Sequence, residues 1–522
     1  MSKERIASCR QRISTALAMR GMKQHELCEL ANIPKSSLSL YLSGAYEPKK
    51  DRLRTMALVL NVSEAWLMGY DVPINRENEI YPKEQKLFVG ENEKVKEMIN
   101  SLFNFIKKSP SAYHTISSVR AALIDRGYKE LYEGDSWQIE KGEGYFVTRG
   151  GSSIIAFRSV GDTTGYNICA SHSDFPAFRV KQSPDRRGAY ITIDVERYGG
   201  AILYSWFDRP LSVAGRVMIR TQIGLETRLL NIDSDIATIP SLAIHLNKGV
   251  NESFGPRLNV DLYPLYSTSG KGSFMSLVAS TLGIEEEKIV STDLFVYNRE
   301  EGRVIGGEGE FILCPRLDDL GCVYTSLCGF LDAEPSSATP VLAIFDNEEV
   351  GSSTRQGAAS TFLYDTLRRL SSTEEEYLRL LSGSFMVSAD NAHAKHPNHP
   401  EMSDPQNAPL LGGGVVVKFN ASQRYTTDSI SHAVFSEICG CAGVKTQTYY
   451  NRADLPGGST LGSISNTKVS VPTIDIGLPQ LAMHSASETA SVSDVTEMTR
   501  ALTAFYSTAI IQKGDIIELK KN

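Results

Sequence analysis

Histidine and acidic residues follow several apolar runs in this sequence, at points where a β-strand is expected to end. His172 comes directly after NICAS, Asp390 directly after FMVSA, and Glu348 and Glu349 come shortly after VLAIFD. In open α/β sheets, the carboxyl ends of the strands line the crevice where ligands bind. We therefore expect these side chains to meet at one edge of a sheet.

Asp318 and His484 extend this set to two imidazoles and several carboxylates. Asp318 lies in PRLDDLG, a polar turn that opens a helix, and His484 follows the strand ending near Ile476 through LPQLAM. Imidazole and carboxylate ligands suit zinc, cobalt or manganese. Two divalent ions roughly 3.5–4 Å apart, sharing one carboxylate, could polarise a peptide carbonyl and anchor a free amine.

A general base and an orienting group are also available. Neighbouring side chains point in different directions, so one of Glu348 and Glu349 could coordinate a metal while the other abstracts a proton. Asp174 lies two positions after His172, on the same face of an extended segment. It could hydrogen-bond the imidazole and fix its tautomer.

Each of these residues also has an ordinary structural explanation. A single histidine after a strand is commonly a hydrogen-bonded core or surface residue, and two adjacent glutamates usually lie on a solvated face. Two aspartates at the start of a helix, such as Asp318 and Asp319, are typical of an N-cap. Only their combined occurrence at strand ends favours a metal site, and the spacing alone leaves both interpretations open.

The composition is that of a globular protein with more than one domain. The chain has 522 residues, 41% hydrophobic and 22% charged, and lacks an apolar run of 18 or more residues, so we expect no membrane span. The N-terminal MSKERIASCRQR is charged and lacks the apolar segment of a secretory signal. The eight cysteines show no CxxC spacing, which favours free thiols and a cytoplasmic location.

Residues 1–70 are expected to form a small all-α domain. They carry eleven Lys and Arg against six Asp and Glu, a net charge of +5, so the remainder carries −12. Helical patterns cover 5–20, 23–31, 35–42, 50–60 and 63–67. Two short helices across a tight turn form a helix-turn-helix arrangement. The segment KQHELCELANIPKSSLSLYLSG also resembles the Cro/repressor-like family.

That resemblance implies a recognition helix at Lys35–Tyr41 and a possible DNA partner. The side chains that would face a major groove are those of Lys35, Ser36, Ser37 and Ser39. A charge of +5 is modest for binding driven by counterion release. A helical bundle used only for protein contacts therefore remains the alternative.

The rest of the chain predicts a linker and a larger α/β body. Residues 71–90 are polar with two prolines and indicate a linker. Many short strands are expected in a β-rich segment at 182–310. After residue 311, strands alternate with helices, the last expected at 491–513, which is typical of an α/β sheet covered by helices on both faces.

Several ordered motifs resemble the aspartyl aminopeptidase family of dinuclear metallopeptidases. They span roughly 90–510, in the family's order: ASHSDFPAFRVK, YGGAILYSWFDRPLSVAGRV, AIHLN, NESFGP, PRLDDL, FDNEEVGSSTRQGA, SADNAHAKHPN, VKFNASQRY and GLPQLAMHS. The resemblance implies a catalytic metallopeptidase domain at 91–181 and 311–522. It also implies that the segment 182–310 is an inserted dimerisation domain, and that the protein forms a homo-oligomer, typically a dodecameric shell.

The resemblance further implies a role for each residue of the metal site. His172 and Asp390 would hold one divalent ion, Glu349 and His484 the other, and Asp318 would bridge them. Glu348 would be the general base, and Asp174 would orient His172. The ions are expected to be zinc, with cobalt or manganese as alternatives.

The resemblance also implies substrate contacts. His393, Lys418 and Tyr425 match substrate-contacting positions, and His245 matches a histidine that reaches the active site of the neighbouring subunit. A cationic Lys418 in the pocket would favour peptides with an N-terminal Asp or Glu. Ser173, Phe175 and Asp319 depart from residues common in the family, but no ligand is lost.

Three functions are compatible with this sequence. One is an acid-selective aminopeptidase that carries an accessory helix-turn-helix domain. Another is a DNA-binding transcriptional regulator whose peptidase fold senses peptides or only oligomerises. The third combines both, with a head that binds DNA and a body that turns over peptide. Because every expected ligand is present, the sequence favours the enzyme.

Overall fold

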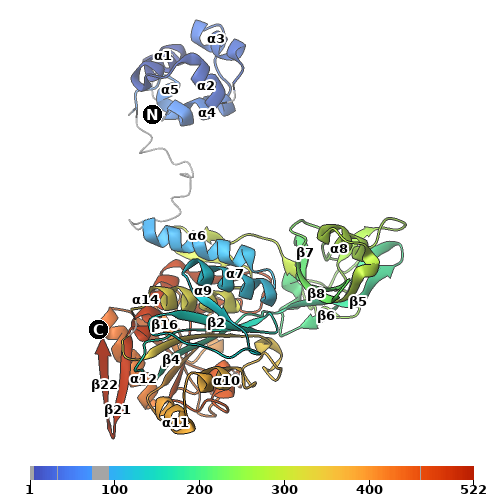
Figure 1. Ribbon diagram of the computed structural model, residues 1–522. Coiled ribbons are helices and arrows are strands. Elements are labelled where there is room, and N and C mark those ends of the chain that lie inside the picture. The colour runs from blue at the N-terminus through green and yellow to red at the C-terminus, as the bar shows by residue number, and fades with distance from the viewer. Residues whose placement is uncertain are drawn as a thin grey trace. The chain divides into compact units, whose positions relative to one another are not determined.

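The chain forms two compact units, residues 1–86 and 87–522, in a computed structural model (Figure 1). The structure describes residues 5–31, 33–60, 62–72, 74, 93–334, 336–458 and 460–521. Most of the expected linker at 71–90 lies outside these ranges. No helix in the described parts of the chain is long and apolar enough to cross a membrane.

The N-terminal unit is a helical bundle that follows the predicted pattern closely. Its helices are α1 (Cys9–Arg20), α2 (Gln24–Leu30), α3 (Lys35–Ser43), α4 (Lys50–Leu60) and α5 (Glu64–Leu67). Ser8 and Gln11 form a capping box at the start of α1. Gly21 ends α1 at φ 60°, a conformation that glycine adopts without strain. The apolar side of each helix faces a shared core that includes Ile13, Leu38 and Trp66.

The body is built on a nine-stranded mixed sheet. Its strands, in spatial order, are β1 (Lys129–Leu131), β2 (Gly144–Arg149), β3 (Ser153–Arg158), β13 (Thr339–Phe345), β4 (Tyr166–His172), β14 (Phe385–Ala389), β18 (Thr473–Gly477), β16 (Val415–Phe419) and β17 (Thr446–Tyr450). The central strands β13, β4, β14 and β18 are parallel to one another. Their carboxyl ends therefore lie at the same edge.

Helices cover both faces of this sheet, as Figure 1 shows for α9 and α14 on one side and α10 and α11 on the other. The first face carries α7 (Ala112–Asp125), α9 (Leu317–Asp332), α12 (Ser429–Ala442) and α14 (Val492–Tyr506). The second face carries α10 (Phe362–Arg369), α11 (Glu374–Ser382) and α13 (Leu461–Ser465). Alternate residues of each strand supply the two cores: Leu342 and Ile344 of β13 face the first, while Val341 and Ala343 face the second.

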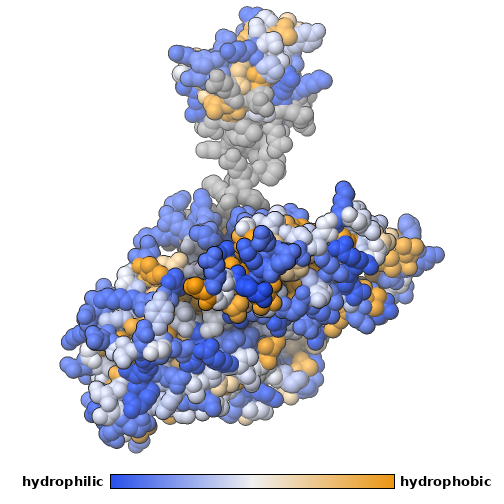
Figure 2. Space-filling model, turned by 45° about the vertical axis from the view of Figure 1, so that its right-hand side comes forward, coloured by the Kyte–Doolittle hydropathy of each residue, from blue (hydrophilic) through white to orange (hydrophobic). Residues whose placement is uncertain are grey.

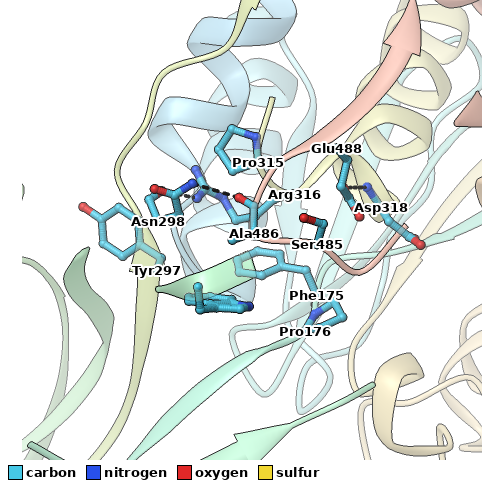
Figure 3. Close-up of a pocket in the computed structure, with 11 residues that line it drawn as sticks. Phe175, Pro176, Tyr297, Asn298, Pro315, Arg316, Asp318, Ser485, Ala486 and Glu488 are labelled. Carbon is cyan, nitrogen blue, oxygen red and sulfur yellow. Dashed lines mark hydrogen bonds between the residues drawn. The ribbon is translucent and has the colours of Figure 1, made fainter. Parts of the chain in front are cut away.

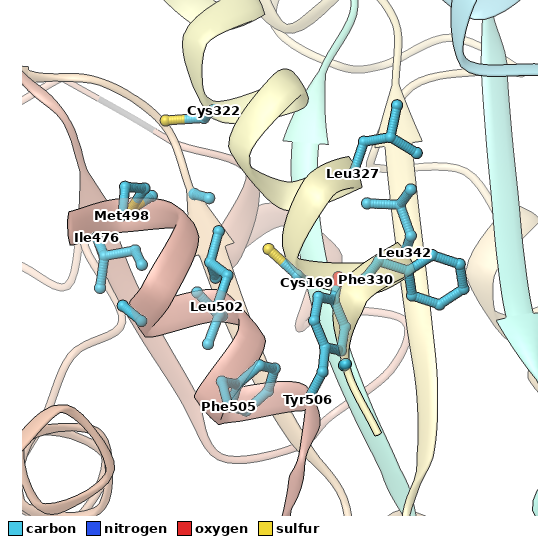
Figure 4. Packing of buried hydrophobic residues seen from close by; sticks show 14 of the residues in the cluster. Cys169, Cys322, Leu327, Phe330, Leu342, Ile476, Met498, Leu502, Phe505 and Tyr506 are labelled. Carbon is cyan, nitrogen blue, oxygen red and sulfur yellow. The ribbon is translucent and has the colours of Figure 1, made fainter. Parts of the chain in front are cut away.

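The packing of α9 and α14 against the sheet is shown in Figure 4. Phe330 of α9 stacks edge-on against Tyr506 of α14 at 5.5 Å between ring centres. Leu502 and Met498 of α14 are fully buried in the same cluster. Because α9 begins at the Asp318 turn, this packing fixes one end of the candidate site.

A second sheet occupies the β-rich segment. Its strands are β8 (Gly224–Asn231), β7 (Leu211–Thr221), β10 (Ile289–Asn298), β5 (Ala177–Arg187), β6 (Tyr190–Tyr198) and β9 (Leu265–Thr268). This sheet begins at Ala177, before the expected boundary at 182. It packs against α8 (Phe274–Leu282), and its apolar core is continuous with side chains of α6 (Glu93–Lys108), α9 and α14. We call this sheet with α8 the inserted sheet.

Two smaller sheets complete the body. A five-stranded sheet contains β11 (Arg303–Ile305), β12 (Phe311–Cys314), β20 (Glu488–Ser491), β19 (Pro479–Leu481) and β15 (Ala392–His393). A hairpin contains β21 (Thr508–Lys513) and β22 (Ile516–Lys521). The helix predicted over 491–513 is therefore wrong beyond Tyr506. The β-branched run from Thr508 to Ile511 pairs across a turn at Gly514, and this pairing prevails over helical continuation.

Candidate metal centre

The carboxyl edge of the nine-stranded sheet carries the expected group of polar side chains. His172 is the last residue of β4, and Asp390 directly follows β14. Glu348 and Glu349 begin the short helix η4 (Glu348–Val350) after β13. Because β4 is parallel to both β13 and β14, these residues lie at one edge of the sheet.

The two carboxylate oxygens of Asp318 face different imidazoles. Asp318 Oδ1 lies 3.5 Å from His172 Nε2, and Asp318 Oδ2 lies 3.5 Å from His484 Nε2. Each imidazole also faces a second carboxylate: Asp390 Oδ1 is 3.8 Å from His172 Nε2, and Glu349 Oε1 is 3.5 Å from His484 Nε2. The cluster thus has two halves that share Asp318.

The donor set of the cluster fits divalent cations. Three groups of residues each bring ligand atoms within 4.8 Å of one another: His172 with Asp318, Asp319 and Asp390; His172 with Glu348 and Glu349; and Asp318 with Glu349 and His484. Asp318 Oδ1 and Glu349 Oε1 are buried and accept no hydrogen bond from the described residues. Buried carboxylate oxygens without a donor are unfavourable unless a cation balances them.

Three carboxyl groups of the cluster hold protons more tightly than usual, while burial acts to raise the pKa of Asp318 but His172 and His484 outweigh it and lower that pKa. Burial raises the pKa of Glu348 to about 7, and the carboxylates of Asp390 and Asp174 act in the same direction. Burial also raises the pKa values of Glu349 and Asp319 well above their ordinary range. A divalent cation would favour the charged forms of these groups and displace their protons.

The pKa values of the two imidazoles are also raised, but by neighbouring carboxylates and against the effect of burial. Burial acts to lower the pKa of His172, but Asp319, Asp174 and Asp318 outweigh it and raise the pKa well above its usual value. Burial opposes the charged form of His484 too, yet its pKa is raised to about 10, chiefly by Asp318. Each histidine must lose its proton to serve as a ligand, so metal binding would release protons here as well.

Asp174 contacts Glu348, Glu349 and His172, which are the predicted base and two of the predicted ligands. Its Oδ1 accepts the backbone N–H of Glu348 at 3.1 Å, and its Oδ2 accepts that of Glu349 at 3.2 Å. His172 Nδ1 lies 3.0 Å from the backbone oxygen of Asp174 and 3.4 Å from its Oδ1. These contacts leave Nε2 of His172 directed at Asp318 and Asp390.

Two further buried carboxylates, those of Glu488 and Asp319, accept hydrogen bonds from the backbone N–H groups of other predicted ligands. Glu488, 1% exposed, accepts the backbone N–H of His484 at 2.7 Å and that of Asp318 at 3.0 Å. The second of these bonds is drawn in Figure 3. Asp319, fully buried, accepts the backbone N–H of His172 at 3.1 Å. Segments far apart in sequence are thereby joined through carboxylates rather than through a metal.

Arg316 anchors the turn that delivers Asp318, as Figure 3 shows. This buried guanidinium donates to the backbone oxygens of Asn298 and Ile106, at 3.0 and 3.1 Å. It also lies over the rings of Phe175 and Tyr297, at 5.5 and 5.4 Å from their centres. The turn is therefore tied to the inserted sheet and to α6.

The expected substrate-contacting residues lie beside Asp390. The Lys418 ammonium donates to the backbone oxygens of Asp390 and Asn391, at 2.7 and 3.2 Å, and lies 3.3 Å from Asp390 Oδ2. It also lies over the ring of the buried Tyr425, at 5.3 Å. His393, on β15, is exposed. Lys418 is thus buried, and the carboxylate that it faces is that of a proposed ligand.

The remaining predicted site residues lie outside this cluster. His245 is exposed, in a turn-rich segment of the β-rich region, and is not among the described residues that form the ligand groups. Lys35, Ser36 and Ser39 are exposed on α3. Ser37 is half-buried and accepts a hydrogen bond from Arg52 at 2.9 Å.

Glu488, Tyr198 and the anchoring role of Asp319 were not anticipated from the sequence. Glu488 lies four residues after His484, and nothing in that position distinguishes it from a glutamate on the surface. Tyr198 ends a strand of the inserted sheet and donates to Asp174 Oδ2 at 2.6 Å. Only the folded chain brings these groups to the ligands, although the adjacency of Asp319 to Asp318 was a usable signal.

Comparison with known proteins assigns the two parts of the chain. The family model for aminopeptidase I zinc metalloproteases (M18) matches residues 105–506, and a helix-turn-helix model matches residues 13–67. A probable M18 family aminopeptidase 2 of Clostridium acetobutylicum is 42% identical over 428 residues, which cover 79% of this chain and 99% of that protein. One from Pseudomonas aeruginosa is 38% identical over 424 residues, with the same coverage.

Solved structures show the same fold. The structure of the Ape4 and Nbr1 complex matches with a TM-score of 0.77 at 33% identity, covering 80% of this chain and 87% of that chain. The S. cerevisiae mApe1 dodecamer matches with a TM-score of 0.70 at 24% identity, covering 80% and 97%. The α/β metallopeptidase fold and the helix-turn-helix domain predicted from the sequence are confirmed. The chain belongs to the aminopeptidase I zinc metalloprotease (M18) family.

Proposed function

We propose that this M18 aminopeptidase uses two divalent ions to remove N-terminal residues, preferably Asp or Glu, from peptides. The observation that carries the two-metal proposal is the position of Asp318, whose two oxygens face different imidazoles. Zinc is the proposed metal, with cobalt or manganese as alternatives. All eight cysteines are free, which agrees with the reducing cytoplasm that we expect.

The proposed ligand sets follow the two halves of the cluster. His172 and Asp390 would hold one ion, Glu349 and His484 the other, and Asp318 would contact both. Bound there, the ions would polarise the scissile carbonyl and lower the pKa of the attacking water. The residues of the chain must then hold the ligands in place and move the proton.

Glu348 is the proposed general base. It is half-buried next to the ligand Glu349, and its backbone is fixed by Asp174. Burial raises its pKa to about 7 in the metal-free protein, and nearby cations would lower that value. The carboxylate could therefore take a proton from water near neutral pH and pass it to the leaving amine.

Replacing Glu348 by Gln should lower kcat by roughly 100-fold or more, because the amide cannot accept the proton. The metal content, measured by atomic emission after dialysis, should match that of the unaltered protein because Glu348 is not a proposed ligand. The matched control is Glu349→Gln, which should lose both metal and turnover. Undiminished kcat in Glu348→Gln would remove Glu348 as the base.

Lys418 is the proposed source of the acidic preference. A substrate carboxylate would replace its longest contact, the 3.3 Å approach to Asp390 Oδ2. A charge-assisted hydrogen bond of this kind contributes ~1.5–3 kcal/mol. The other two contacts, to backbone oxygens, would keep the ammonium in place.

Lys418→Met keeps most of the length of the unbranched side chain and removes its charge. We expect kcat/KM for Glu-p-nitroanilide to fall roughly 10- to 100-fold more than kcat/KM for Gln-p-nitroanilide, since only the first carries a carboxylate. The two substrates have nearly the same shape, so their ratio separates charge recognition from damage to the site. Equal losses would mean that Lys418 only supports Asp390.

We also propose a homo-oligomer assembled through the inserted sheet and its loops. The segment 241–262 exposes Leu242, Ile244, Leu246, Phe254 and Val260 around His245. On the face shown in Figure 2, hydrophobic residues form small patches among hydrophilic ones. Contact between copies would cover this segment and carry His245 towards a neighbouring active site.

Placing a charge in this segment should weaken the assembly. Leu246, 74% exposed, changed to Asp should lower the mass measured by light scattering at micromolar concentration. Ile516→Asp, at a 66% exposed position of the C-terminal hairpin, is the matched control and should keep the full mass. A monomeric unaltered protein, or an unchanged mass for Leu246→Asp, would contradict this assembly surface.

A second candidate function belongs to the N-terminal unit, which matches a helix-turn-helix family model. We propose that it binds duplex DNA through the exposed side chains of Lys35, Ser36 and Ser39 on α3. Ser37, which is bonded to Arg52, would take part only if that bond is released. The enzymatic body would then be held at DNA.

The full-length protein should enrich a discrete sequence from a random duplex pool, and salt should weaken the binding. Lys35→Glu should abolish the enrichment by reversing a charge on the recognition helix. Lys271→Glu makes the same charge change at an exposed position of the body and should leave binding intact. Failure to enrich any sequence would favour a protein-contact role for the unit.

A further inference from the structure

The end of strand β6 brings the inserted sheet into contact with the ligand cluster. Tyr198, the last residue of β6, is half-buried and donates its phenol proton to Asp174 Oδ2 at 2.6 Å. Its oxygen accepts a hydrogen bond from Asn347 Nδ2 at 2.9 Å. The phenol thus lies between the carboxylate of Asp174 and the residue that precedes Glu348.

Asp174 connects Tyr198 to the proposed base, Glu348, and to a proposed ligand, Glu349. The Oδ2 atom that accepts the phenol also accepts the backbone N–H of Glu349, while Oδ1 accepts that of Glu348. The Tyr198 bond is the shortest of the three. Burial and the adjacent Asp174 raise the pKa of the phenol, so it remains a donor throughout the neutral range.

The residues after Tyr198 contact the other half of the cluster. His484 Nδ1 lies 3.2 Å from the backbone oxygen of Gly200, and the backbone N–H of Ile202 donates to the oxygen of His484 at 2.9 Å. A Cβ atom on Gly199 would lie 3.1 Å from Glu349 Oε2, and one on Gly200 would lie 3.1 Å from His484 Nδ1. A side chain at either glycine would press on a proposed ligand, and Gly199, at φ 72°, also has a backbone conformation that favours glycine.

We propose that Tyr198 is a positioning residue for the metal centre, acting through Asp174 on the Glu348–Glu349 turn. The adjoining Gly199–Ile202 backbone holds His484 in the same way, so the inserted sheet supplies part of the frame of the site. This inference rests on the proposed ligands and base. It means that metal affinity and turnover depend on Tyr198, although Tyr198 would touch neither substrate nor metal.

The phenol acts by limiting the directions that Asp174 can adopt. Without it, Oδ2 keeps only the longer bond to Glu349 N–H, and Asn347 Nδ2 loses its acceptor on Tyr198. The turn that carries Glu348 and Glu349 would then be less firmly held. Partners of this kind commonly change metal affinity by roughly 10- to 100-fold when removed.

The test compares Tyr198→Phe with a matched control, Tyr266→Phe. Tyr266 lies on β9 of the same inserted sheet, is half-buried like Tyr198, and donates its phenol proton to the backbone oxygen of Ser273 at 3.4 Å. Each change removes one half-buried hydroxyl group and keeps the ring. Circular dichroism should be the same for both variants and the unaltered protein.

Metal affinity is the first readout, measured on metal-free protein by zinc titration against a chromophoric chelator. We expect Tyr198→Phe to bind at least one zinc ion roughly 10-fold or more weakly, and Tyr266→Phe to bind as the unaltered protein does. With saturating metal, Tyr198→Phe should lower kcat about 10-fold with KM nearly unchanged, because the displaced base acts only in the transition state. Unaltered zinc affinity in Tyr198→Phe, or the same loss in Tyr266→Phe, would overturn the proposal.

A double-mutant cycle tests whether Tyr198 acts through Asp174. In an Asp174→Asn background, Tyr198→Phe should have little further effect on zinc affinity, because the carboxylate that it orients is gone. Fully additive losses would contradict this route. The zinc titration does not depend on the identity of the base, so a failure of the Glu348 assignment would be seen separately, as turnover in Glu348→Gln.

Discussion

The crowding of buried carboxylates is the constraint on which the rest of this site depends. Asp318, Asp319, Glu349 and Asp390 lie around two imidazoles, with Glu348 beside them. Negative charges at such short range cannot all persist in a dry environment unless something balances them. Raised carboxyl pKa values, charged histidines and backbone N–H donors share this role in the metal-free chain.

The same constraint explains why some of these acidic residues hold the loops while others are available to a metal ion. Those whose oxygens are already bonded to backbone N–H groups, Asp174 and Glu488, hold the loops. Asp318 and Glu349 each keep a buried oxygen without a donor among the described residues, and these oxygens are available to a cation. Asp319 combines both features, because one of its oxygens accepts the backbone N–H of His172 and the other has no donor among those residues. The hydrogen bonds that the fold offers therefore distinguish the anchors Asp174 and Glu488 from the proposed ligands Asp318 and Glu349.

Much of this arrangement could be predicted from sequence, because strand ends are local features. An apolar run such as VLAIFD followed by acidic residues indicates both the strand and the edge where its side chains emerge. The helices of the N-terminal unit were likewise predicted from apolar residues at helical spacing, and the structure agrees within a few residues. The resemblance to a known family supplied the role of each proposed ligand.

What could not be predicted depends on contacts between distant segments. Glu488 and Tyr198 become anchors only once β20 and β6 lie against the ligand loops, and nothing in their neighbours in sequence marks them. The strand at Thr508–Lys513 was missed because the pattern of α14 continues smoothly into it. Its pairing with β22 is a tertiary outcome that helical periodicity does not reveal.

Backbone N–H groups of the proposed ligands and base donate to Asp174, Asp319 and Glu488. These bonds affect how the protein would exchange its metal ions. None of these bonds includes a metal, so they can keep the ligand loops ordered before an ion arrives. In zinc fingers, by contrast, much of the binding free energy is spent on folding the chain. A site that is already ordered without metal could lose an ion and bind another without unfolding. Which ion it holds would then depend on the metals available in its surroundings.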